Sequence, residues 1–118
     1  MATVRLAEIA HARSGDKGAS ANVGVIAHTP RGYEFLLGAL PASRVEAYFK
    51  PMGVGPVTRY ELPNLAAFNF LLPGILSGGG SVSLRIDAQG KALGQALLEL
   101  MIDVPDELLP ALGRTNSR

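Results

Sequence analysis

The stretch from Asn22 to His28, which reads Asn-Val-Gly-Val-Ile-Ala-His, decides the fold class of this chain. Its apolar and β-branched residues predict a mostly buried strand. The turn sequence Thr29-Pro30-Arg31-Gly32 ends that strand. Helices are predicted next, over residues 33–40 and 41–50, the second of which begins at a proline that suits a first helical turn. A buried strand that leads into helices indicates a domain built from both.

Further strands are predicted on either side of this stretch. Side chains alternate between apolar and polar over residues 3–6, 57–62 and 81–87, and this period of two is typical of a half-buried strand. The alternation breaks after the first of these strands, so a turn or bulge is expected near Ala7 and Glu8.

Two further helices complete the prediction. Asn64 is expected to cap a helix that runs to about Leu72. A last helix is expected after Gln89-Gly90, and its apolar face would contain Leu93, Leu97, Leu100 and Met101. Residues 105–118 are expected to form one helical turn and a frayed end.

The order strand, strand, helices, strand, helix, strand, helix favours an α+β fold. The most economical version is a ferredoxin-like sandwich, in which helices cover one face of a mostly antiparallel four-stranded sheet. We expect residues 1–104 to form this domain and residues 105–118 to form a C-terminal tail.

Composition excludes several classes of protein. The chain has 118 residues, of which 47% are hydrophobic, so it can build one core and is not intrinsically disordered. Its net charge of +1 is too small for a nucleic-acid binder of this size. It has no cysteine and two histidines, so no metal site and no cofactor are expected. No signal peptide or membrane span is recognisable, and a cytoplasmic location is the expectation.

The densest polar cluster is His11-Ala-Arg-Ser-Gly-Asp-Lys-Gly-Ala-Ser-Ala-Asn22, which is predicted to contain a loop over residues 11–18. Small residues let backbone N–H groups approach a ligand, and positive side chains suit a phosphate or carboxylate. His11 or Asp16 could accept a proton. The candidate anion-binding residues here are Arg13, Ser14, Lys17 and Asn22. The alternative is an ordinary turn with local backbone hydrogen bonds.

A second candidate region contains Arg59, Asn64 and Asn69. Asn69 falls on the apolar face of the predicted helix, so it is expected to be buried and hydrogen-bonded, either to a neighbouring loop or to a ligand. Arg59 could contact a ligand or pair with Glu61 or Asp16. The run Gly78-Gly79-Gly80 lacks the Lys-Ser/Thr of a P-loop and is interpreted as a hinge or a tight loop. A Ser/His/Asp triad of Ser14, His11 and Asp16 is only weakly supported, and so is a metal site of His11, His28 and Asp16.

Several of these motifs together resemble the C-terminal domain of the AtuA-like family, named for acyclic terpene utilisation. They are His-Ala-Arg-Ser-Gly-Asp-Lys-Gly, Val-Thr-Arg-Tyr-Glu-Leu-Pro-Asn, Ala-x-Asn-Phe, Gly-Gly-Gly and Ser-Leu-Arg-x-Asp-x-Gln-Gly-Lys, spread over about residues 3–104. The resemblance implies a ferredoxin-like fold. The positions that match family motifs are His11, Arg13, Ser14, Asp16, Lys17, Asn22, Arg59, Tyr60, Asn64, Asn69, Gly78, Gly79, Gly80 and Arg85.

The resemblance also implies a function. In many members the domain follows a much larger one, so this chain is expected to be a small subunit or paralogue that acts with a larger AtuA-like subunit. Members are associated with the breakdown of branched or terpenoid acids as CoA thioesters. Hydration or dehydration of an enoyl-CoA, with His11 or Asp16 moving the proton, is the expected chemistry. The alternative is a non-catalytic module that forms a homo-oligomer or binds an anionic small molecule.

Overall fold

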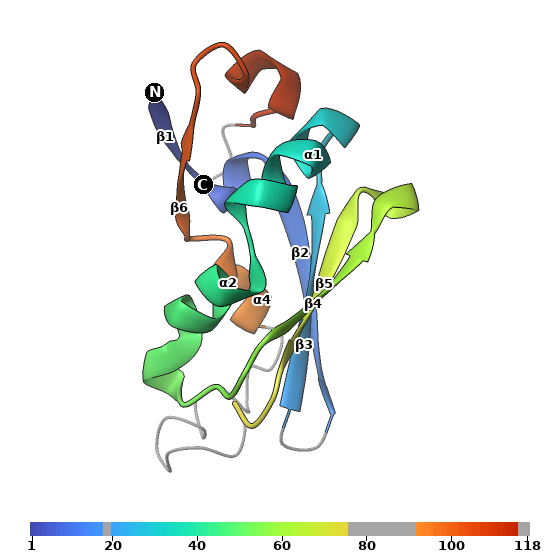
Figure 1. The fold of residues 1–118 in the computed structure, drawn as a ribbon, viewed down its shortest axis with the longest axis vertical. Helices are drawn as coiled ribbons and strands as arrows, with labels where there is room; N and C mark the ends of the chain where they lie inside the picture. Colours follow the sequence, from blue (N-terminus) through green and yellow to red (C-terminus); the bar gives the residue numbers. More distant parts are fainter. Residues whose placement is uncertain (18–19, 76–91, 116–118) are drawn as a thin grey trace.

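The computed structural model describes residues 1–17, 20–75 and 92–115. Figure 1 shows how the elements are arranged. In chain order they are β1 (Ala2–Arg5), η1 (Leu6–Glu8), β2 (Ala10–Lys17), β3 (Ser20–Ala27), α1 (Pro30–Ala39), α2 (Ala42–Phe49), η2 (Lys50–Met52), β4 (Thr58–Leu62), η3 (Pro63–Leu65), β5 (Ala67–Leu72), α4 (Ala92–Leu97), β6 (Met101–Val104) and η4 (Leu109–Leu112).

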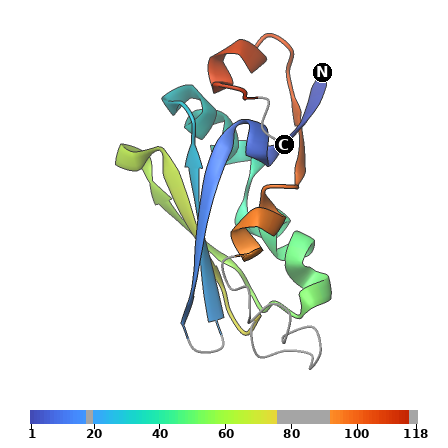
Figure 2. The ribbon, with the colours of Figure 1, turned by 180° about the vertical axis from the view of Figure 1, so that it is seen from behind.

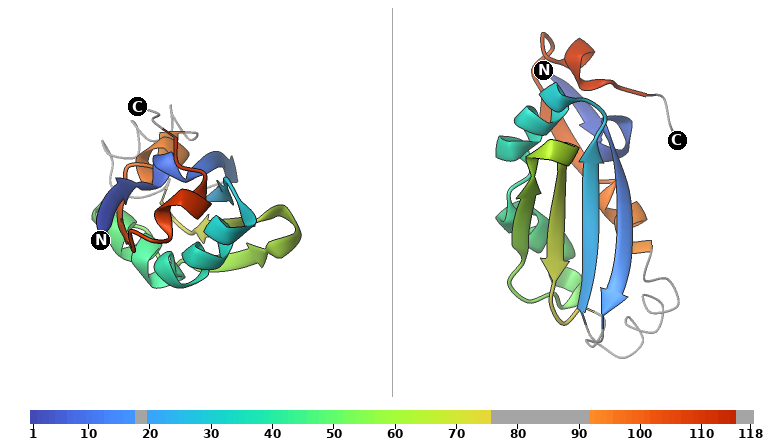
Figure 3. Two further views of the ribbon diagram at one scale, coloured as in Figure 1. Left: turned by 90° about the horizontal axis from the view of Figure 1, so that it is seen from above. Right: turned by 90° about the vertical axis from the view of Figure 1, so that its right-hand side faces the viewer.

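The centre of the fold is a four-stranded sheet in the order β2-β3-β5-β4, with every neighbouring pair antiparallel. A separate two-stranded sheet pairs β1 with β6. Figure 3 shows the helices and the smaller sheet on one side of the four strands, and the other side uncovered. The predicted α+β class, with four antiparallel strands and helices on one face, is confirmed.

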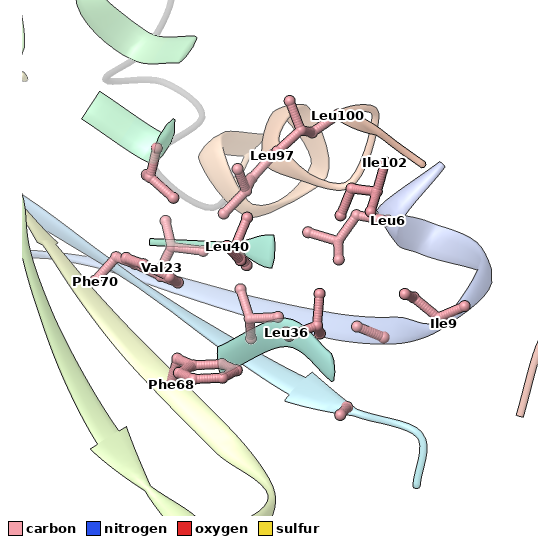
Figure 4. Packing of buried hydrophobic residues seen from close by; sticks show 14 of the residues in the cluster. Leu6, Ile9, Val23, Leu36, Leu40, Phe68, Phe70, Leu97, Leu100 and Ile102 are labelled. Atoms are coloured by element: carbon pink, nitrogen blue, oxygen red, sulfur yellow. The ribbon is translucent and has the colours of Figure 1, made fainter. Parts of the chain in front are cut away.

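The hydrophobic core lies between the sheet and the helices. Alternate residues of β3 and β5 point into it, among them Val23, Val25, Phe68 and Phe70, all of which are completely buried. Leu36 and the other leucines of the helical layer pack against them in Figure 4. The stretch that predicted a buried strand, residues 22–28, therefore forms most of β3, one of the two interior strands of the sheet.

The predicted loop over residues 11–18 is wrong, because residues 10–17 form strand β2. This strand pairs with β3 along its full length, from Ala10↔Ala27 to Lys17↔Ser20. Its polar composition indicated a loop. A strand tolerates that composition here because β2 is at the edge of the described sheet and half of its side chains face away from the core.

The predicted helix from Asn64 to Leu72 is also wrong, because its residues form η3 and strand β5. The apolar residues 65, 68 and 72 fit the helical period, but Phe68, Phe70 and Leu72 fit the strand period and are the ones buried. Hydrogen bonds to strands on both sides decide between the two patterns.

The C-terminal part differs in a similar way. Helix α4 ends at Leu97, and Met101 belongs not to the helix but to β6, where its side chain is exposed. Because β6 pairs with β1, the predicted strand over residues 3–6 belongs to the smaller sheet, as β1, and not to the larger one. The expected helical turn of the tail is η4, which lies between α1 and the β1–β6 pair in Figure 2. The predicted strand over residues 81–87 and the Gly78–Gly80 run lie outside the described residues.

Candidate functional site

The uncovered side of the four-stranded sheet, which we call the open face, gathers many of the candidate residues. Because successive strand residues point to opposite sides, the register defines its members. They are His11, Arg13 and Gly15 of β2, Asn22, Gly24 and Ile26 of β3, Ala67, Asn69 and Leu71 of β5, and Thr58, Tyr60 and Leu62 of β4. The predicted site residues that meet here are His11, Arg13, Asn22 and Asn69.

Donor groups lie in the same row of the open face as a central glycine, Gly24. One row across the four strands contains Arg13, Gly24, Asn69 and Tyr60. The Nδ2 group of Asn22 donates to Oδ1 of Asn69 over 3.1 Å. This leaves Nδ2 of Asn69 without an acceptor among the described residues. The centre therefore presents an amide, a guanidinium and a phenol, all of which can donate to an oxyanion.

Gly24 leaves free space between these donors. A Cβ atom built there would have only two neighbours within 4 Å, the backbone oxygens of Arg13 and Phe68 at 3.8 and 3.9 Å. The fold therefore has room for a larger residue, although glycine weakens a strand interior by about 0.5–1 kcal/mol relative to alanine. By contrast, a Cβ at Gly15 would meet Oδ1 of Asn22 at 3.2 Å, so that glycine accommodates a side chain of the chain itself. Unused space at a strand glycine is typical of a place where another molecule approaches the backbone.

Arg13 is a cation of this face, and it has no acceptor among the described residues. Of the six arginines that the structure describes, five donate to a carboxylate or a backbone carbonyl, namely Arg5, Arg31, Arg44, Arg59 and Arg114. Arg13 is exposed and has no hydrogen-bond partner among the described residues. The described members of the open face also include no carboxylate. An unpaired guanidinium in these surroundings suits an anionic group of another molecule.

Large apolar side chains lie on the β4–β5 side of this polar centre. Tyr60 is 51% exposed, Leu62 41% and Leu71 37%, and all three belong to the open face. Leu65, in the η3 turn between β4 and β5, is 65% exposed. An antiparallel sheet with one solvated face normally carries polar residues there. These exposed apolar side chains indicate a contact surface for another molecule.

Other predicted site residues lie elsewhere. The hydroxyl of Ser14 faces the helical layer, where it accepts a hydrogen bond of 3.3 Å from the backbone N–H of Gly94. Asn64 is exposed in η3. Neither residue is close to the centre of the open face. Ser14 faces the opposite side of the sheet, and Asn64 lies in the turn that connects the ends of β4 and β5.

Arg59 points into the helical side of the sheet as well. Its Nη1 atom donates to the carbonyls of Leu37 and Leu40 over 2.9 and 3.0 Å, and its Nη2 atom donates to Glu61 over 2.8 Å. The guanidinium also lies 5.0 Å from the ring centroid of Phe68. The expected ion pair with Glu61 is present. These contacts join α1 to the edge strand, and they occupy the groups with which Arg59 would hold a ligand.

The two candidate proton acceptors are far apart. His11 and Asp16 are separated by five residues of extended strand, or about 16 Å at the usual rise per residue. A loop would have allowed them to meet, but β2 does not. The side chains of Asp16 and Lys17, and all of Gly78, Gly79, Gly80 and Arg85, lie outside the described residues.

His11 instead meets His28. Their ring centroids lie 4.5 Å apart with an interplanar angle of 57°. Both rings line a cavity of about 230 Å³ at the edge of β2, together with Arg5, Ala7, Ala10, Gln95, Leu98, Glu99 and Thr115. We call it the histidine pocket. From the sequence, His28 is considered only as a weakly supported metal ligand with His11 and Asp16. The β2–β3 pairing that brings it to His11 is the signal that would have revealed it.

Comparison with known proteins agrees with the motifs. The model of the AtuA ferredoxin-like domain matches residues 4–103. The chain belongs to this family. No curated protein and no solved structure matches it. The AtuA ferredoxin-like domain thus spans the whole four-stranded sheet and ends inside β6. Helix η4 and the residues after it lie beyond the match, including Thr115, which lines the histidine pocket.

Neither a metal site nor a membrane-spanning helix is found in the described part of the chain. Residues 1–17, 20–75 and 92–115 contain no group of three or more His, Asp or Glu side chains that could hold a metal ion. The same residues contain no helix long and apolar enough to cross a bilayer.

Proposed function

We propose that the chain is an accessory component that docks through its open face onto a larger AtuA-like subunit. The observation that supports this most directly is the bare sheet face, where Tyr60, Leu62 and Leu71 are exposed on β4 and β5 and Arg13, on β2, has no acceptor among the described residues. Burying such side chains contributes about 25 cal/mol per Å² of apolar area. Docking would cover the sheet face that the chain's own helices leave bare.

The proposed partner surface is apolar with a carboxylate near its middle. That carboxylate would lie above Gly24, where the guanidinium of Arg13 and the free Nδ2 group of Asn69 can both donate to it. A paired arginine fixes the orientation of the two molecules, because its planar fork accepts a carboxylate in a defined geometry. The apolar side chains around it would supply most of the affinity.

The reaction belongs to the assembled complex in this proposal. Family resemblance supports catabolism of branched or terpenoid acids as CoA thioesters in the cytoplasm, with enoyl-CoA hydration or dehydration as the step. His11 would take part in that step as a proton carrier, because it belongs to both the open face and the histidine pocket. Docking would then bring His11 close to the partner's surface.

The experiment is co-expression with a large AtuA-like protein from the same source, followed by affinity capture. Arg13→Glu should reduce complex formation at least tenfold, because it places a carboxylate against the partner's carboxylate. Leu71→Lys should reduce it similarly by placing a charge in the apolar contact. The matched controls are Arg31→Glu and Met101→Lys, which make the same changes on the helical layer and on β6.

The outcomes separate the proposal from its alternatives. Loss of binding in both open-face variants, with both controls unaffected, supports docking on this face. If all four variants bind like the original chain, the proposal is wrong. If the isolated chain is a dimer by light scattering and the open-face variants are monomers, the face joins two copies of this chain rather than a larger subunit.

A further inference from the structure

The C-terminal segment holds the ring of His28 in one position. Nδ1 of His28 lies 2.8 Å from the carbonyl oxygen of Gly113. Gly113 has a φ of 66°, and a Cβ atom built there would lie 2.9 Å from Cγ2 of Thr29 and 3.0 Å from Cβ of His28. This close approach and this backbone conformation both require glycine. The carbonyl that contacts the ring is therefore placed by the fold itself.

The same contact fixes the tautomer of His28. A carbonyl oxygen can only accept a hydrogen bond, so Nδ1 carries the proton. In the neutral ring Nε2 is then an acceptor, and it has no hydrogen-bond partner among the described residues. Gly113 lines a different cavity, next to η4. The Nδ1 edge of the ring therefore faces away from the histidine pocket, and the Nε2 edge is the one that reaches it.

The size and the walls of the histidine pocket suit a small molecule with an apolar part. Its volume is about 230 Å³. A cavity of about 150 Å³ holds one benzene molecule, so a molecule with about six non-hydrogen atoms fits here. Ala7, Ala10 and Leu98 supply apolar walls. One acceptor in a fixed direction beside an apolar wall is typical of a small-molecule site.

The charged groups around the histidine pocket favour a neutral ligand. Arg5 and Glu99 both line the pocket and pair with each other over 3.2 Å. Arg114 pairs with Glu8 over 2.7 Å, and Arg13, on β2, has no acceptor among the described residues. Three arginines and two glutamates leave an excess of one positive charge, which repels an amine. An anion would be repelled by the Glu99 carboxylate and by the lone pair of Nε2, whereas a neutral donor avoids both costs.

We infer that the histidine pocket binds a small aliphatic alcohol. The hydroxyl of the alcohol would donate to Nε2 of His28, and its carbon atoms would lie against Ala7, Ala10 and Leu98. Both imidazoles stay neutral, and His11 acts as a wall whose ring centroid lies 4.5 Å from that of His28. A water molecule can also donate to Nε2, but an alcohol buries apolar surface in addition. This site does not depend on docking by the open face.

NMR spectra that correlate ring protons with ring nitrogens test the inference on isotope-labelled chain. The chain contains two histidines, and the bare and the protonated nitrogens of a neutral ring give separate signals. His11→Gln assigns the spectrum, because the signals that remain belong to His28. At about pH 8, where imidazole groups are ordinarily neutral, the free chain should have its His28 proton on Nδ1. A proton on Nε2 instead would contradict the inference.

The probes are cyclopentanol and cyclopentanone, which share a carbon skeleton and of which only the alcohol can donate a hydrogen bond. Cyclopentanol should move the Nε2 signal of His28 toward the frequency of a protonated ring nitrogen. It should bind about three- to tenfold more tightly than cyclopentanone, because the ketone leaves Nε2 without a donor. If cyclopentanol leaves the Nε2 signal in place, the pocket holds only water and the inference is wrong. Equal binding of the two probes would exclude a role for the hydroxyl and would also overturn it.

A variant of the apolar wall tests where the alcohol binds. Leu98→Asn makes this wall polar and should weaken cyclopentanol binding at least about threefold. Leu37→Asn makes the same change at a partly buried position of α1 and should leave binding unchanged. If Leu98→Asn binds cyclopentanol like the original chain, the alcohol lies elsewhere and the assignment to this pocket is wrong. The titration of the original chain decides the inference if a variant fails to fold.

Discussion

Glu8 shows how one side chain joins two distant parts of the chain. Its Oε2 atom accepts a hydrogen bond from the backbone N–H of Arg5 over 2.8 Å, and its Oε1 atom accepts one from Arg114 over 2.7 Å. Burial raises the pKa of Glu8, but the backbone hydrogen bond from Arg5 and the guanidinium of Arg114 lower it by more, so its pKa lies below the ordinary glutamate value. The carboxylate therefore stabilises the fold only while it is charged.

The pH dependence of stability follows from this lowered pKa. The stabilisation by Glu8 should be complete above about pH 5 and should be lost as the pH falls through the folded-state pKa, because the unfolded chain then binds the proton more readily. Glu8→Gln should lower the free energy of unfolding by about 1–2 kcal/mol at pH 7 and by much less at pH 3. Urea unfolding at both pH values measures this. The control Glu34→Gln removes an exposed ion pair and should change it by less than about 0.5 kcal/mol. An equal effect of Glu8→Gln at both pH values would contradict the prediction.

At the scale of elements, the sequence predicted the buried strand β3 and helices α1 and α2 well, but not β2 or β5. The difference has a physical cause. β3 contains a clear run of apolar residues and the two helices have apolar residues at helical spacing, whereas β2 has only small or polar ones. In β5 the apolar residues fit both periods. Pairing with β3 decides the structure of both segments, and pairing between distant residues cannot be recognised from local composition.

The contacts of the Arg59 side chain with distant residues could not be recognised from local composition either, and their role can be tested. The fork of Arg59 reaches two carbonyls at the end of α1 and the carboxylate of Glu61 at once, which the single ammonium of a lysine cannot do. Arg59→Lys should therefore lower the free energy of unfolding by about 1–3 kcal/mol. Arg31→Lys, on an exposed pair of α1, should change it by less than about 0.5 kcal/mol. Urea unfolding followed by circular dichroism compares the two, and equal stability of the Arg59→Lys and original chains would contradict a structural role.

At the scale of the whole molecule, the candidate site was partly predictable. The family motifs pointed to His11, Arg13, Asn22 and Asn69, and the register of three strands places all four on one face. The same motifs could not separate these residues from Ser14 and Arg59, because facing in or out depends on strand parity. The sequence offered His28 only as a weakly supported metal ligand and did not indicate the residues after η4, because His28, Gly113 and Thr115 come together near His11 only in the folded chain.

The final test concerns the segment beyond the family match, which ends at residue 103. Leu112 is completely buried, and three hydrogen bonds of 2.8 Å attach residues 111–115 to Glu8, His28 and Thr29. A chain that ends at Val104 loses this burial and these bonds, so its free energy of unfolding should fall by at least about 3 kcal/mol.

Leu112→Ala separates the contribution of packing from the loss of the whole segment. It should lower the free energy of unfolding by about 2–4 kcal/mol by leaving a cavity. Leu65→Ala, at a position that is 65% exposed, should lower it by less than about 0.5 kcal/mol. Urea unfolding of all three chains gives the comparison. If the shortened chain and Leu112→Ala are both as stable as the original, residues 105–115 do not stabilise the domain. If both are destabilised as expected, the stable folding unit extends past the family boundary, and Gly113, which holds His28, is part of it.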